Sequence, residues 1–260
     1  MRKPLHQKAR PYCKINLGLH VVGRRPDGYH DLETIFLPVH DLRDELEIVE
    51  GPLAMHQDGI ALDNAPDDNL CLRAWRLLHD ELGIPPVQIR LKKGIPFGAG
   101  LGGGSSDAAF TLKMLNEMFA LGLDSTALAL RAARLGADCP FFIHNQPAYA
   151  TGIGDRLSPI ELDLSAYRIA VEIPADEHVS TREAYAGIDR SRFGQPRPDL
   201  RQAIRRPIAE WRHLIVNDFE ASIFPSHPAI AKLKEEMYQH GALYASMTGS
   251  GAAVFGIFRK

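Results

Sequence analysis

The alternation of apolar and polar residues near the start of the chain predicts strands. Apolar side chains alternate with polar ones in KINLGLHVVG, and YHDLETIFLPV and DELEIVE are rich in aromatic and β-branched residues. RRPDGYH, between the first two of these segments, contains Pro, Asp and Gly and predicts a turn or loop. We therefore expect a strand-rich N-terminal region.

Helical spacing of apolar residues follows. The segment NLCLRAWRLLHDELG, residues 69–83, has this spacing and ends at Gly83, a residue type that commonly terminates a helix. Residues 105–122 and 124–136 predict two more helices, the second capped by Asp124 or Ser125. VQIRLKK alternates as a strand does, and ADCPFFIHN and PAYATGIGDRLSPI indicate a return to strand and turn.

The pattern changes near Pro159. YRIAVEIP predicts a buried strand, STREAYAGI, NDFEASIF and HPAIAKLKEEMYQHG predict helices, and ALYASMTGSGAAVFGIF predicts two strands joined by a glycine turn. Residues 189–207 form an irregular, arginine-rich stretch. Because strands and helices mix without a strict strand–helix–strand order, we expect an α+β protein rather than a doubly wound parallel sheet. The change near Pro159 predicts two domains, residues 1–155 and 156–260.

Composition narrows the class of protein. The 260 residues are 45% hydrophobic and 24% charged with a formal net charge of -2, which gives no global signal for nucleic acid or an anionic membrane. The 3 cysteines are far apart and form no C-x-x-C pair, which argues against disulfides or a zinc site. The basic N-terminus leads into no apolar signal region, and no long apolar run occurs. We expect a cytoplasmic protein with no membrane partner.

The stretch IPFGAGLGGGSSDAAF concentrates glycine ahead of a predicted helix. It could be a packing turn, a dinucleotide-binding loop or a phosphate cradle. Gly98, Gly100 and Gly103 satisfy G-x-G-x-x-G, but the preceding strand is polar, Pro96 intervenes, and no acidic residue ends a second strand at the required distance. A phosphate cradle fits better, because glycines let successive backbone N–H groups face an anion and the helix adds its positive end. No G-K-[ST] triplet of a Walker A loop occurs.

Four segments carry a resemblance to one family. PFGAGLGGGSSDAA resembles the central ATP-binding motif of the GHMP kinases, which include galactokinase, homoserine kinase and mevalonate kinase. PYCKINLGLHVVGRRPDGYHDLETIF, GADCPFF and MTGSGAAVFGIF are similar to further motifs of the family, in the same order, between residues 11 and 258. The resemblance implies a two-domain α+β kinase with its active site in the cleft between the domains. The spelling GLGGGSS is most similar to the branch that phosphorylates the 2-hydroxyl of a CDP-linked methylerythritol.

The resemblance implies that Lys14 and Asp138 are the catalytic pair. Phosphoryl transfer needs the phosphates held, the charge neutralised and the acceptor hydroxyl aligned. Lys14 would stabilise developing negative charge, and Asp138 would take the hydroxyl proton. From the residues alone, Lys14 could equally be a solvated strand edge and Asp138 a turn former. Cys139, beside Asp138, is interpreted as a packing residue.

The ATP side includes the glycine loop and two residues outside it. Asn69 and Lys93 occupy positions similar to the family's adenosine contacts, although a plain surface position is an alternative for both. Mg²⁺ is expected as the counter-ion of ATP, and no acidic cluster predicts a metal site held by the protein alone. The expected ATP-binding residues of the loop are Pro96, Gly98, Ala99, Gly100, Leu101, Gly102, Gly103, Gly104, Ser105 and Ser106.

The substrate side is predicted from three segments. Asn16 shares a strand face with Lys14, and Tyr29 and His30 suit a nucleobase, by stacking and hydrogen bonding. The resemblance implies that Tyr29 and His30 bind the cytosine, that Tyr185 forms a second aromatic wall, and that Thr181 contacts the substrate. Gly249 and Ser250 form the turn expected beside the acceptor. Without the family, a Tyr-His pair at a β-turn and a plain hairpin turn are the alternatives.

Other functions stay open at this point. A GHMP kinase for homoserine or mevalonate is one, and a non-catalytic nucleotide-binding or RNA-binding module is another. The near-neutral charge and the lack of a basic stripe with interleaved aromatics argue against RNA, so no nucleic-acid partner is expected. The arginines of residues 189–207 either form a solvated loop or attract the diphosphate of the substrate. The protein is expected to be a monomer or a homodimer.

Overall fold

The computed structural model describes residues 5–60 and 68–260, and these form two compact units. The first unit comprises residues up to Cys13, His40–Phe97 and Gly102–Asn145. The second unit comprises Lys14–Val39, Gly98–Leu101 and Gln146–Lys260. The units are interleaved along the sequence, so a single boundary between residues 155 and 156 does not coincide with them.

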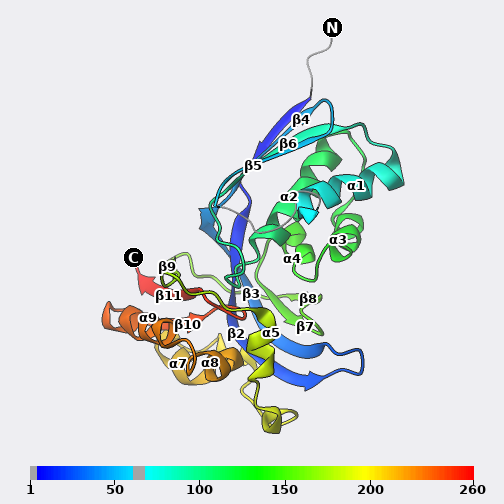
Figure 1. Ribbon diagram of the computed structural model, residues 1–260. Coiled ribbons are helices and arrows are strands. Elements are labelled where there is room, and N and C mark those ends of the chain that lie inside the picture. The colour runs from blue at the N-terminus through cyan, green and yellow to red at the C-terminus, as the bar shows by residue number, and fades with distance from the viewer. Residues whose placement is uncertain (1–4, 61–67) are drawn as a thin grey trace. The chain divides into compact units, whose positions relative to one another are not determined.

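The first unit is a sheet with helices on one face (Figure 1). In β6, Val87, Ile89 and Leu91 are buried while Arg90 and Lys92 are exposed, so one face of the sheet is covered and the other meets solvent. The strand order is β1-β4-β6-β5, with β5 parallel to β6 and the other pairs antiparallel. The strands are β1 (His6–Ala9), β4 (Glu45–Glu50), β5 (Ala54–Gly59) and β6 (Val87–Lys93), and the helices are α1 (Leu70–Leu82), α2 (Gly103–Met118), α3 (Ser125–Ala133) and α4 (Cys139–His144).

The predicted C-terminal end of α1 and the predicted N-terminal cap of α3 are confirmed, whereas α3 ends at Ala133 instead of Gly136. Asn69 caps α1, and Gly83 ends it in the left-handed conformation. Asp124, rather than Ser125, caps α3, and its Oδ1 accepts a hydrogen bond from the amide of Ala127 at 2.7 Å. Helix α2 begins at Gly103, ahead of the predicted serine start, because the glycines themselves take helical conformation.

The predicted strand after Asp138 is wrong, because Cys139–His144 forms the short helix α4. Its proline lies in the first turn, where the missing N–H of proline costs no hydrogen bond. The apolar run that suggested a strand packs on all sides instead: Phe141, Phe142 and Ile143 are all buried, and α4 lies against α2 and α3. Periodicity does not distinguish a short buried helix from a buried strand.

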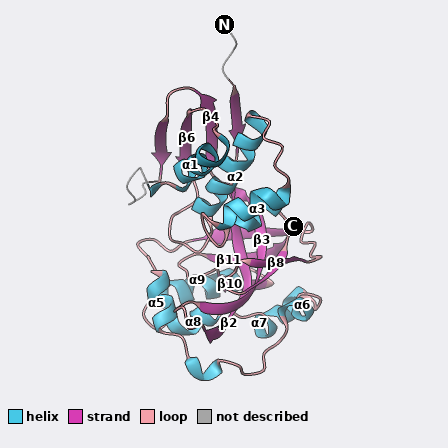
Figure 2. Cartoon of the chain, turned by 90° about the vertical axis from the view of Figure 1, so that its right-hand side faces the viewer, coloured by secondary structure: helices cyan, strands magenta, loops and turns pink. Residues whose placement is uncertain are grey.

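The second unit contains two further sheets (Figure 2). Strands β2 (Tyr12–Arg24), β3 (His30–Arg43), β7 (Ala148–Thr151) and β8 (Arg156–Pro159) lie in that order. The other sheet has the order β10-β11-β9, with β9 (Tyr167–Glu172), β10 (Tyr244–Met247) and β11 (Val254–Arg259), and α9 packs on it. The helical segments are α5 (Thr181–Ala186), η2 (Arg190–Arg192), α6 (Leu200–Ala203), η3 (Ile208–Glu210), α7 (Trp211–Leu214), α8 (Asp218–Ile223) and α9 (Pro228–Gln239).

Strand β2 is an edge strand whose open side is covered by the rest of the second unit. The amides of Lys14 and Leu19 donate to the carbonyls of Leu101 and Val216, both at 2.9 Å. The amide of Val21 donates to Oδ2 of Asp218 at 2.8 Å. These bonds satisfy backbone groups that would otherwise be exposed at the sheet edge. They also connect β2 to the glycine loop and to the segment that leads into α8.

The arginine-rich segment is not simply a solvated loop. The guanidinium of Arg197, only 11% exposed, forms an ion pair with Asp218 and donates to the carbonyl of Val21 at 3.4 Å. Arg201 bonds Asp199 at 2.8 Å and lies 4.8 Å from the ring centroid of Tyr149. Both side chains therefore attach this segment to the second unit.

None of the helices in residues 5–60 and 68–260 combines the length and the hydropathy that a membrane-spanning helix needs.

Candidate functional site

Lys14 lies in the buried part of β2. Its side chain is almost fully enclosed, its Nζ donates to Oδ1 of Asn16 at 2.5 Å, and it lies 4.9 Å from the ring centroid of Phe36. A lysine at a solvated strand edge would be exposed, so that alternative is wrong. Burying an ammonium group is costly unless polar partners or a ligand compensate for the lost water.

Asn16 joins three elements around Lys14. Its Nδ2 donates to Oγ1 of Thr34 on β3 at 3.0 Å, and its backbone amide donates to Oγ1 of Thr248 at 2.8 Å. The hydroxyl of Thr248 in turn donates to Oδ1 of Asn16 at 3.3 Å. Because the same Oδ1 accepts from Lys14, this network orients the lysine ammonium relative to the turn that follows β10. The predicted pairing of Lys14 and Asn16 on one strand face is confirmed.

Asp138 immediately precedes α4 and is partly buried. Its carboxylate makes no capping hydrogen bond to the backbone of α4. The neighbouring Cys139 is fully buried, and this burial raises the pKa of its thiol to about 12. The thiol therefore stays protonated, which supports a packing role. Asp138 belongs to the first unit and Lys14 to the second.

The first part of the glycine loop is fixed by its carbonyl groups. The carbonyl of Ala99 accepts from the amide of Ala253 at 3.3 Å, and that of Leu101 accepts from the amide of Lys14 at 2.9 Å. In a planar trans peptide the carbonyl and the following N–H point in opposite directions. The N–H groups of Gly100 and Gly102 are therefore directed away from β2 and from the residues before β11. This is the arrangement that a backbone anion site requires.

Gly100 and Gly249 bring two backbone segments into direct contact. Gly100 has φ +77, and a Cβ atom there would lie 2.2 Å from the carbonyl oxygen of Thr248. Gly249 has φ +56, and its Cβ would lie 2.9 Å from Cα of Gly100. Only glycine fits either position, because both the conformation and the space exclude a side chain. The loop and the turn after β10 therefore form one continuous backbone surface in the second unit.

The second part of the loop is the start of α2. Gly103 and Gly104 lie in its first turn, where backbone N–H groups have no partner within the helix. The hydroxyl of Ser106 is completely buried and has no hydrogen-bond partner among the described residues, whereas Ser105 hydrogen-bonds the thiol of Cys139. An orphaned buried hydroxyl at a helix N-terminus is a donor or acceptor available to a ligand.

Lys93 lies in a buried ionic cluster. Its Nζ forms ion pairs with Asp44 and, at 2.7 Å, with Asp107 of α2. Asp44 also accepts the amides of Gly94 and Ile95 at 2.6 and 2.8 Å. The surface alternative for Lys93 is therefore wrong, since its ammonium ties the strand before the loop to α2.

The same cluster explains the acidic residue beside the loop. The carboxylate of Asp107 is directed to Lys93 and is almost fully buried. Burial, followed by the charge of Asp44, raises the pKa of Asp107 to about 8 against the opposing effect of Lys93. Burial lowers the pKa of Lys93, but its two carboxylate partners outweigh this and the net shift is upward. Asn69 caps α1 and donates to Gln57 at 3.1 Å, so its side chain has a structural role as well.

The predicted base-binding residues lie on β3, α5 and the turn before β3. Tyr29 is 61% exposed, and its amide donates to Asp27 at 3.1 Å, as a β-turn residue does. His30 stacks directly on Tyr185, with ring centroids 4.5 Å apart and 18° between the planes. Tyr185 also meets Phe219 edge to face at 4.9 Å. The structure thus brings His30 and Tyr185 together and leaves the ring of Tyr29 in solvent.

Thr181 and Ser250 connect α5 to the turn between β10 and β11. Their hydroxyl oxygens lie 3.3 Å apart, and Thr181 is the first residue of α5. Ser250 follows Gly249 directly, so this contact extends the backbone surface formed with the glycine loop. Within the second unit, Thr181 on the predicted substrate side is therefore connected through Ser250 and Gly249 to the glycine loop.

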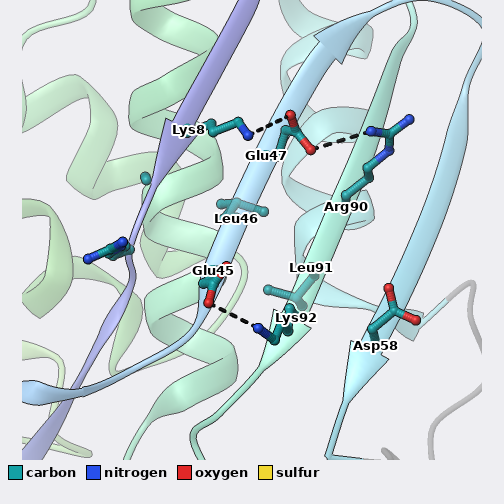
Figure 3. A pocket seen from close by; sticks show the side chains of 10 residues that line it. Lys8, Glu45, Leu46, Glu47, Asp58, Arg90, Leu91 and Lys92 are labelled. Carbon is teal, nitrogen blue, oxygen red and sulfur yellow. Dashed lines mark hydrogen bonds and ion pairs between the residues drawn. The ribbon is translucent and has the colours of Figure 1, made fainter.

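A separate hollow of about 660 Å³ lies over the open face of the first unit's sheet (Figure 3). Its charged side chains neutralise one another across the strands: Glu47 pairs with Lys8 at 3.2 Å and with Arg90 at 3.5 Å, and Lys92 pairs with Glu45 at 3.2 Å. None of the predicted site residues lines it. We interpret it as a solvated sheet face and not as the candidate site.

Comparison with known proteins agrees with the motifs. The GHMP kinases N terminal domain matches residues 69–146, and the GHMP kinases C terminal domain matches residues 199–260. The chain is 51% identical over 253 residues to a 4-diphosphocytidyl-2-C-methyl-D-erythritol kinase from Bacteroides thetaiotaomicron, covering 95% of this chain and 90% of that protein. It is 46% identical to the enzyme of the same name from Porphyromonas gingivalis, covering 96% and 91%. The chain belongs to the GHMP kinase family.

Solved structures of GHMP kinases support the same fold. A crystal structure of a 4-(cytidine 5'-diphospho)-2C-methyl-D-erythritol kinase matches with a TM-score of 0.82 at 34% identity, over 96% of this chain and 90% of that one. Mevalonate kinase from Methanococcus jannaschii matches with a TM-score of 0.72 at 16% identity, over 98% and 91%, which shows the fold alone. The predicted α+β GHMP kinase fold is confirmed. Because GHMP kinases are enzymes, the comparisons favour a kinase over a non-catalytic binding module.

The GHMP kinase domain matches do not cover all of the candidate site. The glycine loop and Asp138 fall within residues 69–146, and Gly249 and Ser250 fall within residues 199–260. Six predicted residues fall outside both: Lys14, Asn16, Tyr29, His30, Thr181 and Tyr185.

Sequence reasoning missed three residues that shape the site. Thr248 accepts a hydrogen bond from the amide of Asn16, the ring of His178 occupies the space beside Gly98 that a Cβ would need, and Asp44 anchors Lys93. Thr248 is adjacent to the glycine turn and was within reach of a motif argument. His178 and Asp44 belong to no functional motif, so only the fold reveals them.

Proposed function

We propose that this protein transfers the γ-phosphoryl group of ATP to the 2-hydroxyl of 4-diphosphocytidyl-2-C-methyl-D-erythritol. The observation that carries the proposal is the 51% identity over nearly the whole chain to a kinase named for this substrate. A GHMP kinase for homoserine or mevalonate is the weaker candidate, because the mevalonate kinase match rests on 16% identity. The product would be an intermediate of the non-mevalonate route to isoprenoid precursors.

The glycine loop would hold the phosphates of ATP. The outward N–H groups of Gly100 and Gly102 and the first-turn amides of α2 provide donors that need no further rearrangement. The orphaned hydroxyl of Ser106 suits a phosphate oxygen or the metal ion that accompanies ATP. Asn69 and Lys93 remain the proposed adenosine-side residues.

Mg²⁺ would enter with ATP as its counter-ion and would neutralise charge on the phosphates. Among residues 5–60 and 68–260, no group of three or more His, Cys, Asp or Glu side chains is arranged to hold a metal ion. The hydroxyl of Ser106 is one protein oxygen of the loop region that has no partner among the described residues and could contact such an ion. The protein would therefore hold the metal mainly through the nucleotide.

Lys14 and Asp138 would act on the acceptor hydroxyl and the transferring group. The ammonium of Lys14, oriented by Asn16, would stabilise the negative charge that develops on the transferring phosphoryl oxygens. The carboxylate of Asp138 would accept the proton of the 2-hydroxyl as the new O–P bond forms, and ADP would leave with the electrons of the broken bond. Gly249 and Ser250 would border the acceptor.

The identity of the acceptor is tested by ADP release with a panel of alcohols. We expect turnover with 4-diphosphocytidyl-2-C-methyl-D-erythritol at a kcat/KM at least about 100-fold above that for homoserine or mevalonate, since neither alcohol carries a base to bind. Phosphate at the 2-position of the product would be located by ³¹P–¹H correlation. Higher kcat/KM with homoserine or mevalonate would contradict the proposed substrate.

The cytosine assignment predicts a selective effect of Tyr29→Ala. The exposed ring of Tyr29 is the aromatic face available for stacking, and its loss should raise KM for the CDP-linked substrate by about tenfold or more. KM for ATP should change by less than about twofold, because the residue would contact only the acceptor. Steady-state kinetics with each substrate varied in turn makes the comparison. Equal increases in both KM values would count against the base-binding role.

The remaining parts of the proposal concern partners and location. We infer a small-molecule enzyme, monomeric or homodimeric, with neither nucleic-acid nor membrane partners, on the basis of its formal net charge of -2. A cytoplasmic location is supported by the 3 cysteines, which form no C-x-x-C pair.

A further inference from the structure

His227 is a largely buried histidine that has no role in the proposed reaction. It lies at the start of α9, with Nδ1 2.5 Å from Oε2 of Glu177 and Nε2 3.0 Å from Oε1 of Glu183. An ionised carboxylate only accepts hydrogen bonds, so the two contacts together favour a ring with both nitrogens protonated. We interpret His227 as an imidazolium with a carboxylate at each end.

The two carboxylates belong to the same segment as the predicted substrate residues Thr181 and Tyr185. We call residues 177–185 the α5 segment. Its His178 ring lies 3.0 Å from the position that a Cβ on Gly98 would take. Its Thr181 hydroxyl meets Ser250 at 3.3 Å, and its Tyr185 ring stacks on His30. The α5 segment therefore contacts the glycine loop, the turn after β10 and the start of β3, all within the second unit.

Most side chains of this segment are exposed or half-buried. Helix α5 has 6 residues, of which only Ala184 is buried, and helices this short have little stability of their own. The segment also has the buried side chain of Val179, a cap bond from Glu183 to Ser180 at 3.1 Å, and a bond from Ser222 to the carbonyl of Ala184 at 3.0 Å. The contacts of Glu177 and Glu183 with His227 are the charged contacts that attach the segment to the start of α9.

The other charged groups on the neighbouring helices are engaged elsewhere. On α8, Glu220 bonds Lys234 at 2.6 Å and Asp218 pairs with Arg197. On α9, Lys232 pairs with Glu236 at 3.1 Å. Glu177 and Glu183 are thus the charges that face the ring of His227. Their hydrogen bonds raise the pKa of His227 above its usual value, against a smaller opposing effect of burial.

The direction of the pH dependence follows from this shift. A histidine whose pKa is raised in the folded state contributes fully at low pH, and the contribution is lost as pH rises through the folded-state value. The unperturbed pKa is about 6.5, so the loss falls above that pH. As the ring loses a proton, the side chains of Glu177 and Glu183 lose the charged group that both of them contact.

We propose that His227 is a positioning residue for substrate binding: its imidazolium holds the α5 segment in the conformation in which Thr181 and Tyr185 meet the cytidine end of the substrate, so that substrate affinity falls as pH rises. The inference rests on the proposed function for the identity of the substrate. It assigns to His227 no contact with either substrate.

The test compares His227→Gln with wild type between about pH 6 and 9. In the variant, KM for the CDP-linked substrate should rise about tenfold at the low-pH end, as expected for lost hydrogen bonds to charged groups. kcat and KM for ATP should change by less than about twofold. In wild type, KM for the CDP-linked substrate should rise with pH, and this rise should be absent in the variant.

The matched control is His240→Gln, which changes the exposed histidine at the other end of α9 and should behave as wild type. Unchanged KM for the CDP-linked substrate in His227→Gln would overturn the proposal. So would an equal loss in kcat and in both KM values, because that pattern indicates a general folding role. If His227→Gln does not fold, the wild-type pH profile and Glu183→Gln, which removes one carboxylate charge, decide instead, and a KM that is flat with pH in both overturns the proposal.

A second measurement separates this proposal from the proposed function. Amide hydrogen exchange of residues 177–187 in the free protein, expressed as protection factors corrected for intrinsic pH effects, needs no substrate. Protection should fall as pH rises in wild type. In His227→Gln it should be lower than in wild type at the low-pH end, and the two proteins should converge as pH rises. If the CDP-linked compound is not phosphorylated, the function is wrong and these factors alone decide the role of His227 as an attachment. Protection that is equal in both proteins at every pH overturns it.

Discussion

Replacing Asp138 by Asn should lower kcat by at least about 100-fold, because an amide cannot accept the proton of the acceptor hydroxyl. The substitution keeps the size of the side chain and its ability to form hydrogen bonds, so folding should be little affected. ATP should still bind with a similar dissociation constant. Rapid-quench or coupled ADP assays measure kcat, and calorimetric titration measures nucleotide affinity.

The control for this result is Asp124→Asn. Asp124 also precedes a helix, and Asn caps helices as well as Asp does, so kcat should be unchanged. Near-normal turnover in Asp138→Asn would show that the carboxylate is not the proton acceptor. Loss of ATP binding along with turnover would instead indicate that Asp138 shapes the nucleotide site.

Replacing Gly100 by Ala should disrupt the phosphate loop more severely than any other single methyl group. The new Cβ would lie 2.2 Å from the carbonyl oxygen of Thr248, and alanine would be strained at φ +77. The neighbour is backbone and not a flexible side chain, so the loop itself must move. We expect KM for ATP to rise about tenfold or more and the free energy of unfolding to fall by roughly 1–3 kcal/mol.

Gly122→Ala separates the effect of backbone strain from the effect of the steric clash with Thr248. Gly122 has a similar φ of +71, but a Cβ there meets nothing within 4 Å. Its substitution should cost about 1–2 kcal/mol from backbone strain while leaving KM for ATP unchanged. Urea unfolding and ATP-dependent kinetics of both variants give the comparison. If Gly100→Ala binds ATP as wild type does, the loop does not hold the phosphates in the way proposed.

The sequence predicts local structure well where the signal is local. The helix end at Gly83, the cap at Asp124 and the strand-turn-strand near the C-terminus follow from residue types within a few positions of each other. The cap at Asn69 was not predicted. The helix after Asp138 does not follow from local residue types, because its proline and phenylalanines suit a buried strand equally well until α2 and α3 are in place. The short strands β1 and β5 are largely polar and carry no periodic signal of their own.

The residues of the candidate site also divide into those with a local sequence signal and those that only the fold reveals. The glycine loop is visible in the sequence because glycine at such density has few other uses. The buried state of Lys14 and the anchoring of Lys93 between Asp44 and Asp107 are not visible, since they depend on strands and helices far apart in the chain. His227 carries no motif, and only its two carboxylate neighbours reveal its charge.

The bond between the amide of Asn16 and the hydroxyl of Thr248 spans 232 positions of the sequence. During translation the N-terminal partner leaves the ribosome long before the C-terminal one exists. The network that orients Lys14, and the backbone contact that fixes Gly100, can therefore form only after the chain has been synthesised beyond Gly249. A nascent chain that ends before these residues lacks the groups that orient Lys14 and fix the glycine loop.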